Sequence, residues 1–306
     1  MNAMKTVRWM AVLTLALPVL TRAADEPASR PPAPPLLLSH DALQQRLNDN
    51  HIRLLDVRSR EAYEKGHVPG AVWVDVKELQ ALTRPEAFAD KDAWARGLAP
   101  LAIDNESEVY VYDDDRQHIA GRVWWLLSYA GVSHVGLIDG GFPLWEREKR
   151  PVSSELTRVE PHAFAVNFHA RRAVSRDEVR SAIGDSKVQI VDARSAAEYR
   201  GEKKPQNGGR AGHIPSARSL DLYRLVDADG RFLSAEAQRE LLARAGIATD
   251  RPVIVYSQGG SRSGGVVFAL RRLGIPARHY FSGLSDWASD PSAPISEGDE
   301  AGRRAE

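Results

Sequence analysis

The residues of this chain best suited to chemistry cluster in one short run, S-Q-G-G-S-R. Its two adjacent glycines permit tight backbone turns, so that consecutive N–H groups can point toward one small volume. Arg262 adds a full positive charge and, in this interpretation, most of the affinity. Hydroxyls, backbone N–H groups and a guanidinium are hydrogen-bond donors suited to a small anion. The predicted anion-binding loop consists of Ser257, Gln258, Gly259, Gly260, Ser261 and Arg262.

The flanking sequence predicts how this loop is positioned. Val253–Tyr256 is a short apolar run with β-branched residues, typical of a strand buried on both faces of a parallel sheet. Val266–Leu273 is typical of a helix, and Gly274 would end it. The loop would then join the carboxyl end of a strand to the amino end of a helix. Unpaired N–H groups and the helix dipole favour an anion at such a place.

The chain carries an internal repeat. D-V-R at 56–58 and G-H-V-P-G-A at 66–71 return in the same order as D-A-R at 192–194 and G-H-I-P-S-A at 212–217, at offsets of 136 and 146 residues. A repeat that keeps its motifs in the same order indicates a tandem duplication. Strand-like and helix-like segments alternate in each half, which predicts an α/β fold with a parallel sheet covered by helices on both faces.

The predicted organisation has six segments. Lys5 and Arg8 precede an apolar stretch that is too short to span a bilayer, and small residues follow. We therefore expect cleavage after Ala23 and export to a periplasm; a permanent N-terminal membrane anchor is the alternative. The segments are a signal peptide at 1–23, a Pro-rich linker at 24–36, an N-terminal domain at 37–150, a linker at 151–171, a C-terminal domain at 172–296 and a polar tail at 297–306.

Composition excludes several classes of function. Hydrophobic residues make up 43% and charged residues 27%, as in ordinary globular domains. Lys+Arg and Asp+Glu both number 41, so no overall field would gather nucleic acid or an anionic membrane, and we expect neither partner for the processed chain. There is no cysteine, which excludes disulfides and thiolate metal sites. His67 and His213 lie in isolated G-H-x-P turns, and we expect no metal and no cofactor.

Taken together, these motifs resemble the rhodanese family, in particular the two-domain thiosulfate and 3-mercaptopyruvate sulfurtransferases. The resemblance rests on both copies of D-x-R and G-H-x-P, the loop at 257–262 and S-G-L-S-D-W at 282–287, and it extends from about Leu36 to Ile295. It implies tandem rhodanese-like domains, each a five-stranded parallel sheet with helices on both faces. It also implies an active loop in the C-terminal domain, where a cysteine would carry sulfur as a persulfide from thiosulfate or 3-mercaptopyruvate. Arg194 matches a family arginine near the ligand; an ion pair with a loop carboxylate is the alternative.

Two positions of the C-terminal half depart from the family pattern, whereas the N-terminal half lacks the cysteine as the family's N-terminal domain usually does. Ser257 stands where the family has its cysteine, and an alcohol oxygen cannot form a persulfide. Glu198 stands where the family often has a second arginine, for which Arg210 in the insertion at 202–210 is a candidate substitute. In the N-terminal half Asp113, within D-D-D-R, occupies the place that matches Ser257, so we expect that domain to be non-catalytic.

Three functions remain open on the sequence. The first, which we favour, is a non-catalytic protein that binds a small sulfur-containing anion or oxyanion, or a protein partner, at the loop. The second is an active sulfurtransferase, with an external thiol as carrier or with cysteine at position 257 in the natural gene. The third is a serine-dependent hydrolase or phosphotransferase, which would need a general base that the loop itself lacks.

Overall fold

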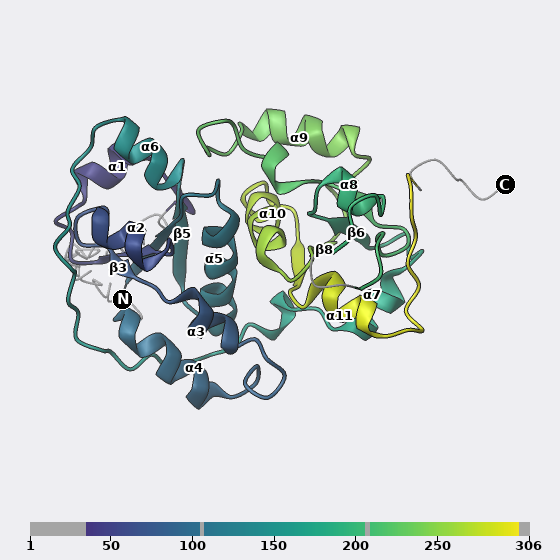
Figure 1. The fold of residues 1–306 in the computed structure, drawn as a ribbon, viewed down its shortest axis with the longest axis horizontal. Coiled ribbons are helices and arrows are strands. Elements are labelled where there is room, and N and C mark those ends of the chain that lie inside the picture. The colour runs from purple at the N-terminus through teal and green to yellow at the C-terminus, as the bar shows by residue number, and fades with distance from the viewer. Residues whose placement is uncertain (1–34, 105–106, 206–208, 300–306) are drawn as a thin grey trace, which may run out of the picture. The chain divides into compact units, whose positions relative to one another are not determined.

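Strands and helices alternate along both halves of the chain (Figure 1). The computed structural model describes residues 35–104, 107–205 and 209–299. The predicted signal peptide at 1–23 lies outside these residues, as do nearly all of the first linker and most of the polar tail. No helix within the described ranges combines the length and apolar character needed to cross a bilayer.

The first half contains a complete α/β unit, in which η denotes a short 3-10 helix. Its elements are β1 (Leu37–Leu38), α1 (His40–Gln45), β2 (Ile52–Asp56), α2 (Arg60–Lys65), β3 (Val72–Trp73), α3 (Val76–Ala81), α4 (Lys91–Leu98), η1 (Ala99–Leu101), β4 (Glu108–Tyr112), α5 (His118–Ala130), β5 (His134–Ile138) and α6 (Gly141–Arg147).

The second half follows a similar order, with η2 where the first half has β1. Its elements are η2 (Ala170–Arg172), α7 (Arg176–Ala182), β6 (Gln189–Asp192), α8 (Ala196–Tyr199), β7 (Arg218–Ser219), η3 (Leu222–Arg224), α9 (Ala235–Arg244), β8 (Val253–Tyr256), α10 (Ser261–Arg272), β9 (Ala277–Tyr280) and α11 (Gly283–Ser289).

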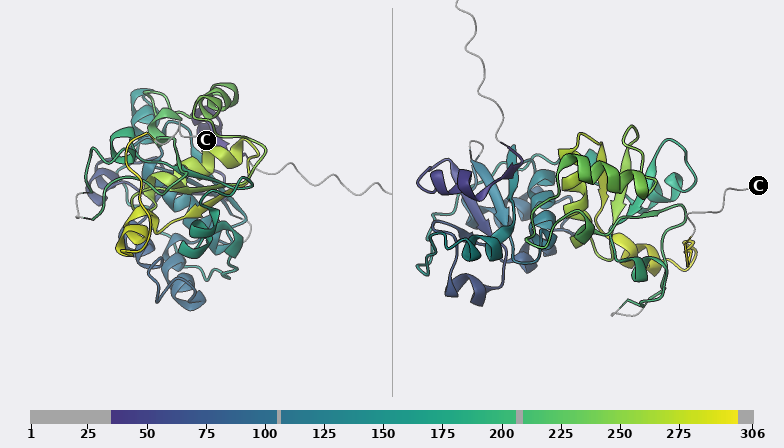
Figure 2. Two further views of the ribbon diagram at one scale, coloured as in Figure 1. Left: turned by 90° about the vertical axis from the view of Figure 1, so that its right-hand side faces the viewer. Right: turned by 90° about the horizontal axis from the view of Figure 1, so that it is seen from above.

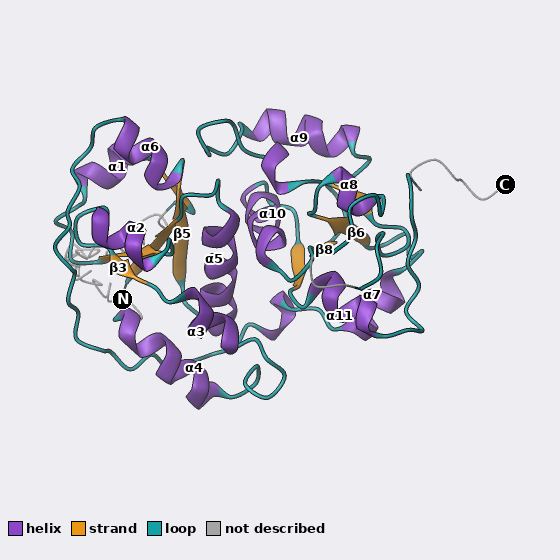
Figure 3. Ribbon diagram, viewed as in Figure 1, coloured by secondary structure: helices purple, strands orange, loops and turns teal. Residues whose placement is uncertain are grey.

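Both sheets are entirely parallel, as the alternation of strands and helices predicts. The first has the order β1-β5-β4-β2-β3 and the second β7-β6-β8-β9. Successive side chains of a strand face opposite sides of its sheet. In β8, accordingly, Val253 and Val255 pack in one hydrophobic cluster, while Ile254 and Tyr256 pack in another. Helices therefore cover both faces of each sheet (Figure 3), and the central strand β8 is buried along its whole length.

The second sheet has four strands, so the expectation of five in each domain is wrong for this half. In the first half, β1 pairs with β5 at the edge of the sheet. At the corresponding edge of the second sheet the chain forms η2 and then makes a single parallel bridge, between Ala173 and His279. Because the helical turn ends only one residue earlier, the extended segment is too short for a strand.

Helices α5 and α10 join the two halves. They lie side by side in Figure 1 and in the right-hand view of Figure 2, and one hydrophobic cluster runs through both. Glycines permit this close approach: a Cβ atom at Gly121 would lie 2.5 Å from the Cα atom of Gly265. The amino ends of both helices follow the strand ends at which the repeated loops lie, so this packing brings residues of the first half to the predicted site.

Candidate anion-binding site

The predicted loop lies between β8 and α10, where the sequence places it. Gly260 caps α10 with a left-handed φ of 85°, and a Cβ atom there would collide with the carbonyl oxygen of Phe281. The helix begins at Ser261, earlier than predicted, because this glycine turns the chain directly into it. Ser261 and Arg262 are therefore first-turn helical residues, and only Ser257–Gly260 is loop.

The backbone of this segment presents unsatisfied donors. The Ser257 hydroxyl is buried and accepts one hydrogen bond, from the Gly260 N–H at 3.1 Å. Within the described chain, four neighbouring N–H groups have no acceptor, those of Gln258, Gly259, Ser261 and Arg262. Unpaired N–H groups at the start of a helix attract anions.

A cavity of about 280 Å³ opens over these donors. The loop and first-turn residues line one side of it, and His118 and Tyr223 line the other. The Tyr223 hydroxyl lies 3.1 Å from an oxygen of Asp115, which also accepts a 2.8 Å contact from His118. Burial, with the charge of Asp115, raises the pKa of Tyr223 to about 12, so its phenol keeps its proton at neutral pH.

Arg262 does not face the cavity as a free charge. Its two terminal nitrogens donate to the two oxygens of Glu198 at 2.6 and 2.8 Å. Glu198 is held in place by a capping box with Ser195 at the start of α8. Burial raises the pKa of Glu198, but hydrogen bonds from Arg262 and Ser195 outweigh it and lower the value to about 2. This ion pair weakens the charge that Arg262 can offer to a ligand, which the sequence did not indicate.

Arg194 is buried beneath the loop and does not line the cavity. It forms a bidentate ion pair with Asp192, and it donates to the Gly212 carbonyl at 2.7 Å. Its remaining terminal nitrogen lies 3.3 Å from the side-chain oxygen of Gln258. The alternative interpretation, an ion pair with a carboxylate, thus describes its position; through Gln258, Arg194 orients the loop.

Arg210 does not substitute for the missing family arginine. Its guanidinium donates to backbone carbonyls around the end of α11, those of Ala288, Asp290 and Ala293. That suggestion from the sequence is therefore wrong. The insertion places Arg210 where its charge satisfies carbonyl groups that the end of a helix leaves unpaired.

Arg122 of α5 reaches the loop from the first half, and sequence reasoning missed it. It donates to the Gly259 carbonyl at 2.7 Å and to the Ser261 hydroxyl at 2.9 Å. Burial lowers the pKa of Arg122 to about 10, and no described carboxylate pairs with it. The match between Asp113 and Ser257 implied that α5 and α10 hold equivalent places in the repeat, but it did not indicate that they pack against each other.

A buried hydrogen-bonded chain runs behind Ser257. Its hydroxyl lies 3.1 Å from that of Ser263, which lies 2.6 Å from Nε2 of His279 on β9. Burial, with the charge of Arg122, lowers the pKa of His279 to about 3. An effective general base has a pKa near the working pH. His279 is too weak a base to activate Ser257 near neutrality, which argues against the serine-hydrolase interpretation.

The matching loop of the first half is filled by its own side chain. The buried Asp113 carboxylate accepts four backbone N–H bonds, from Asp115, Gln117, Ile119 and Ala120, at 2.9 to 3.2 Å. The N–H groups that would hold an external anion are thus occupied by an internal one. This loop can bind no ligand in the same way while Asp113 is in place.

Comparison with known proteins agrees with this architecture. A model of the rhodanese-like domain matches residues 39–148 and 175–290. The sulfur carrier protein TtuD of Thermus thermophilus is 32% identical over 280 residues, covering 87% of this chain and 98% of that protein. The thiosulfate sulfurtransferase of Azotobacter vinelandii is 31% identical over 265 residues, covering 85% and 97%. The crystal structure of the 3-mercaptopyruvate sulfotransferase SseA from Escherichia coli is similar with a TM-score of 0.72 and 26% identity, covering 82% of this chain and 99% of that one.

Proposed function

This chain belongs to the rhodanese-like family of thiosulfate and 3-mercaptopyruvate sulfurtransferases, and on that premise we propose that it binds a small sulfur anion without transferring sulfur. One observation carries the proposal: four backbone N–H groups that have no acceptor among the described residues lie beside a cavity, and a hydroxyl lines this cavity where the family's chemistry requires a thiol. A persulfide needs a sulfur atom to carry it, and this sequence has no cysteine.

The ligand class follows from the donors. Thiosulfate, sulfate and the carboxylate of 3-mercaptopyruvate all present several oxygens to several N–H groups. The local charges nearly cancel, because Arg262 is paired with Glu198 and Arg194 with Asp192. We therefore assign most of the attraction to the backbone N–H groups. Arg122, which donates to the loop but does not line the cavity, adds only a nearby positive charge, and we expect weak, reversible binding.

The test introduces at position 257 the aspartate that the first loop has at position 113. In Ser257→Asp the new carboxylate can accept the loop N–H groups, as Asp113 does, and calorimetry with thiosulfate should lose at least about tenfold in affinity. Ser257→Ala is the matched control. It removes only the hydroxyl, leaves the N–H groups open and should change affinity by less than about tenfold. Equal binding by the Asp and Ala variants would place the anion elsewhere.

An activity assay separates this proposal from the active-enzyme alternative. With thiosulfate and cyanide, the purified protein should form no thiocyanate above background, both alone and with glutathione as an external thiol. Turnover that appears only with glutathione would establish an external sulfur carrier. Turnover without it would require a sulfur carrier that this chain lacks. Either form of turnover would overturn the non-catalytic assignment.

We also propose that the chain is exported. The order of basic, apolar and small residues at 1–23 supports this assignment. Mass spectrometry of the protein recovered from a bacterial periplasmic fraction should find a chain that begins at Ala24. An unprocessed chain retained with the membrane would favour the N-terminal anchor instead.

A further inference from the structure

A second cavity, of about 370 Å³, lies at the other end of the α5–α10 pair. Ser128 near the end of α5 and Arg271 near the end of α10 line it, whereas His118 and Ser261 at the starts of these helices line the loop cavity. At a rise of 1.5 Å per residue, the two cavities are roughly 15 Å apart along either helix. The second cavity is thus separate from the rhodanese loop.

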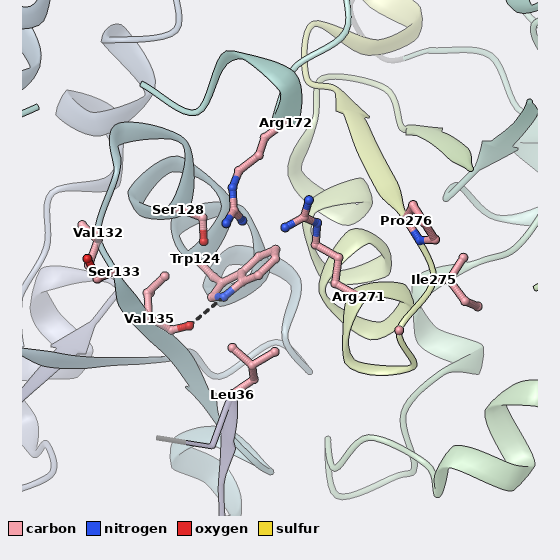
Figure 4. Close-up of a pocket in the computed structure, with 11 residues that line it drawn as sticks. Leu36, Trp124, Ser128, Val132, Ser133, Val135, Arg172, Arg271, Ile275 and Pro276 are labelled. Carbon is pink, nitrogen blue, oxygen red and sulfur yellow. Dashed lines mark hydrogen bonds between the residues drawn. The ribbon is translucent and has the colours of Figure 1, made fainter. Parts of the chain in front are cut away.

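Two arginines dominate its polar side. Figure 4 shows the guanidinium groups of Arg172 and Arg271 pointing toward one another above Trp124 and Ser128. Each arginine uses its Nε atom in a hydrogen bond, Arg172 to Nδ1 of His169 at 3.2 Å and Arg271 to the Ala277 carbonyl at 3.1 Å. The terminal NH₂ groups of both side chains have no acceptor among the residues that the structure describes.

The two positive charges are uncompensated. Neither arginine takes part in a salt bridge with a carboxylate of the described chain, and the positive charge of Arg271 acts on Arg172. Burial and this neighbouring charge lower the pKa of Arg172 to about 10, and burial lowers that of Arg271. His169 does not offset these charges. Burial and the charge of Arg172 lower the pKa of His169, so its ring is neutral at pH 7. Two half-buried cations that face each other without a carboxylate are a costly arrangement that an anion would relieve.

The opposite side of the cavity is apolar. The Trp124 indole N–H already donates to the Val135 carbonyl at 3.0 Å, so the ring offers only its hydrocarbon surface (Figure 4). Leu36 is 41% exposed at the cavity edge and is one of the few large apolar side chains left uncovered in the described chain. A ligand with an apolar group would remove the exposed surface of Leu36 from water, whereas Trp124 is already buried.

We propose that this cavity is a binding site for a small organic dianion, such as a phosphate monoester, with a compact apolar group. The head group lies between Arg172 and Arg271, each of which offers a planar fork of donors suited to phosphate oxygens. The Ser128 hydroxyl supplies a further donor, and the apolar group packs against Leu36 and Trp124. The site differs from the loop in mechanism as well as place, because it uses side-chain charge where the loop uses backbone N–H groups.

The first experiment uses the unaltered protein and phenyl phosphate as the probe. In ¹⁵N-labelled protein, the indole N–H resonance of Trp124, identified by its loss in Trp124→Phe, should shift as phenyl phosphate is added. The indole resonances of Trp145 and Trp287, buried in other clusters, should not move. A shift confined to the amides of Gly259 and Gly260, or no shift at millimolar phenyl phosphate, would overturn the proposal.

The second experiment measures the contribution of each arginine. Arg172→Gln and Arg271→Gln should each weaken phenyl phosphate binding at least about tenfold in calorimetry. Arg272→Gln is the matched control. Arg272 is the next residue of α10 after Arg271, but it donates to the Leu233 carbonyl outside the cavity, so this variant should leave the affinity for phenyl phosphate unchanged. Equal binding by all three variants would exclude the cavity as the site. Ser257→Asp, which occupies the loop N–H groups, should leave phenyl phosphate binding unchanged, and this keeps the result independent of the loop assignment.

Discussion

The two repeated loops solve the same structural problem in opposite ways. Each follows a buried strand, turns through a left-handed residue and opens a helix whose first N–H groups need acceptors. In the first half, the Asp113 carboxylate accepts four of these bonds. In the second, the Ser257 hydroxyl accepts one, and the remaining donors face a cavity. A duplicated fold therefore keeps the donors in both halves, and one side chain decides whether they stabilise the protein or can bind a ligand.

The arginines beneath the loops show the same division. Arg58 and Arg194 each pair with the aspartate two residues earlier and with a backbone carbonyl of the following turn. Arg58 then lies 3.6 Å from the ring centre of Phe142, which covers it with an apolar side chain. Arg194 instead contacts Gln258 of the open loop. The contacts that both arginines share, with the aspartate and the carbonyl, stabilise the fold. The contact that differs, with Phe142 or with Gln258, is the one nearest the loop.

The largest expected effect comes from replacing the oxygen of Ser257 by sulfur. Ser257→Cys should convert a protein without sulfurtransfer into one that releases thiocyanate from thiosulfate and cyanide. The open N–H groups and the helix start should lower the pKa of the new thiol into the reactive range of roughly 3.5–7.5. Mass spectrometry should detect the persulfide after thiosulfate alone. A folded but inert Ser257→Cys protein would show that more than one atom separates this loop from the family's chemistry.

The next effect is a loss of stability when the side chain that accepts the loop N–H groups is removed from either half. Asp113→Ala removes the acceptor of four buried N–H bonds and should lower the free energy of unfolding by about 3 kcal/mol or more. Ser257→Ala, which removes the acceptor of one, should cost about 1 kcal/mol. Urea unfolding measures both. Added sulfate should partly restore the stability of Asp113→Ala, since an external anion can then reach the vacated N–H groups. Equal losses in both variants would contradict the comparison.

The smallest effect is a pH dependence of the free energy of unfolding that arises from the Glu198–Arg262 pair in the second half. The first half has no such pair, because Ala62 holds the place that matches Glu198. Because the pKa of Glu198 is about 2 in the folded protein and about 4.3 in an unfolded chain, the pair stabilises the fold fully above pH 5. This contribution, on the order of 1 kcal/mol, is lost as the pH falls from 5 to 2. Glu198→Gln should flatten the decline in unfolding free energy over this range. Glu64→Gln, in an exposed pair with Arg60, is the control and should leave the decline unchanged.

Local sequence was enough to predict the frame of the site. Val253–Tyr256 is a buried strand, Gly260 turns the chain, and the helix follows, because these features depend on neighbouring residues. The repeat predicted two equivalent domains, and the absence of cysteine excluded a persulfide on the chain itself. The error at the edge of the second sheet arose where the chain forms a helical turn with no strong signal of its own.

Only the tertiary structure decided which charges act at the site. Glu198 and Arg262 meet within the second half, and Arg122 reaches the loop from the first half. Arg172 of η2 faces Arg271 of α10 (Figure 4). These partners are far apart in the chain, so neither local sequence nor a periodic spacing of residues predicts that they come together. Burial then sets the strength of each charge, because desolvation and the nearest opposite charge change together as the chain folds. The sequence determined the donors of the loop, and the packing of the two halves determined where a positive charge remains free.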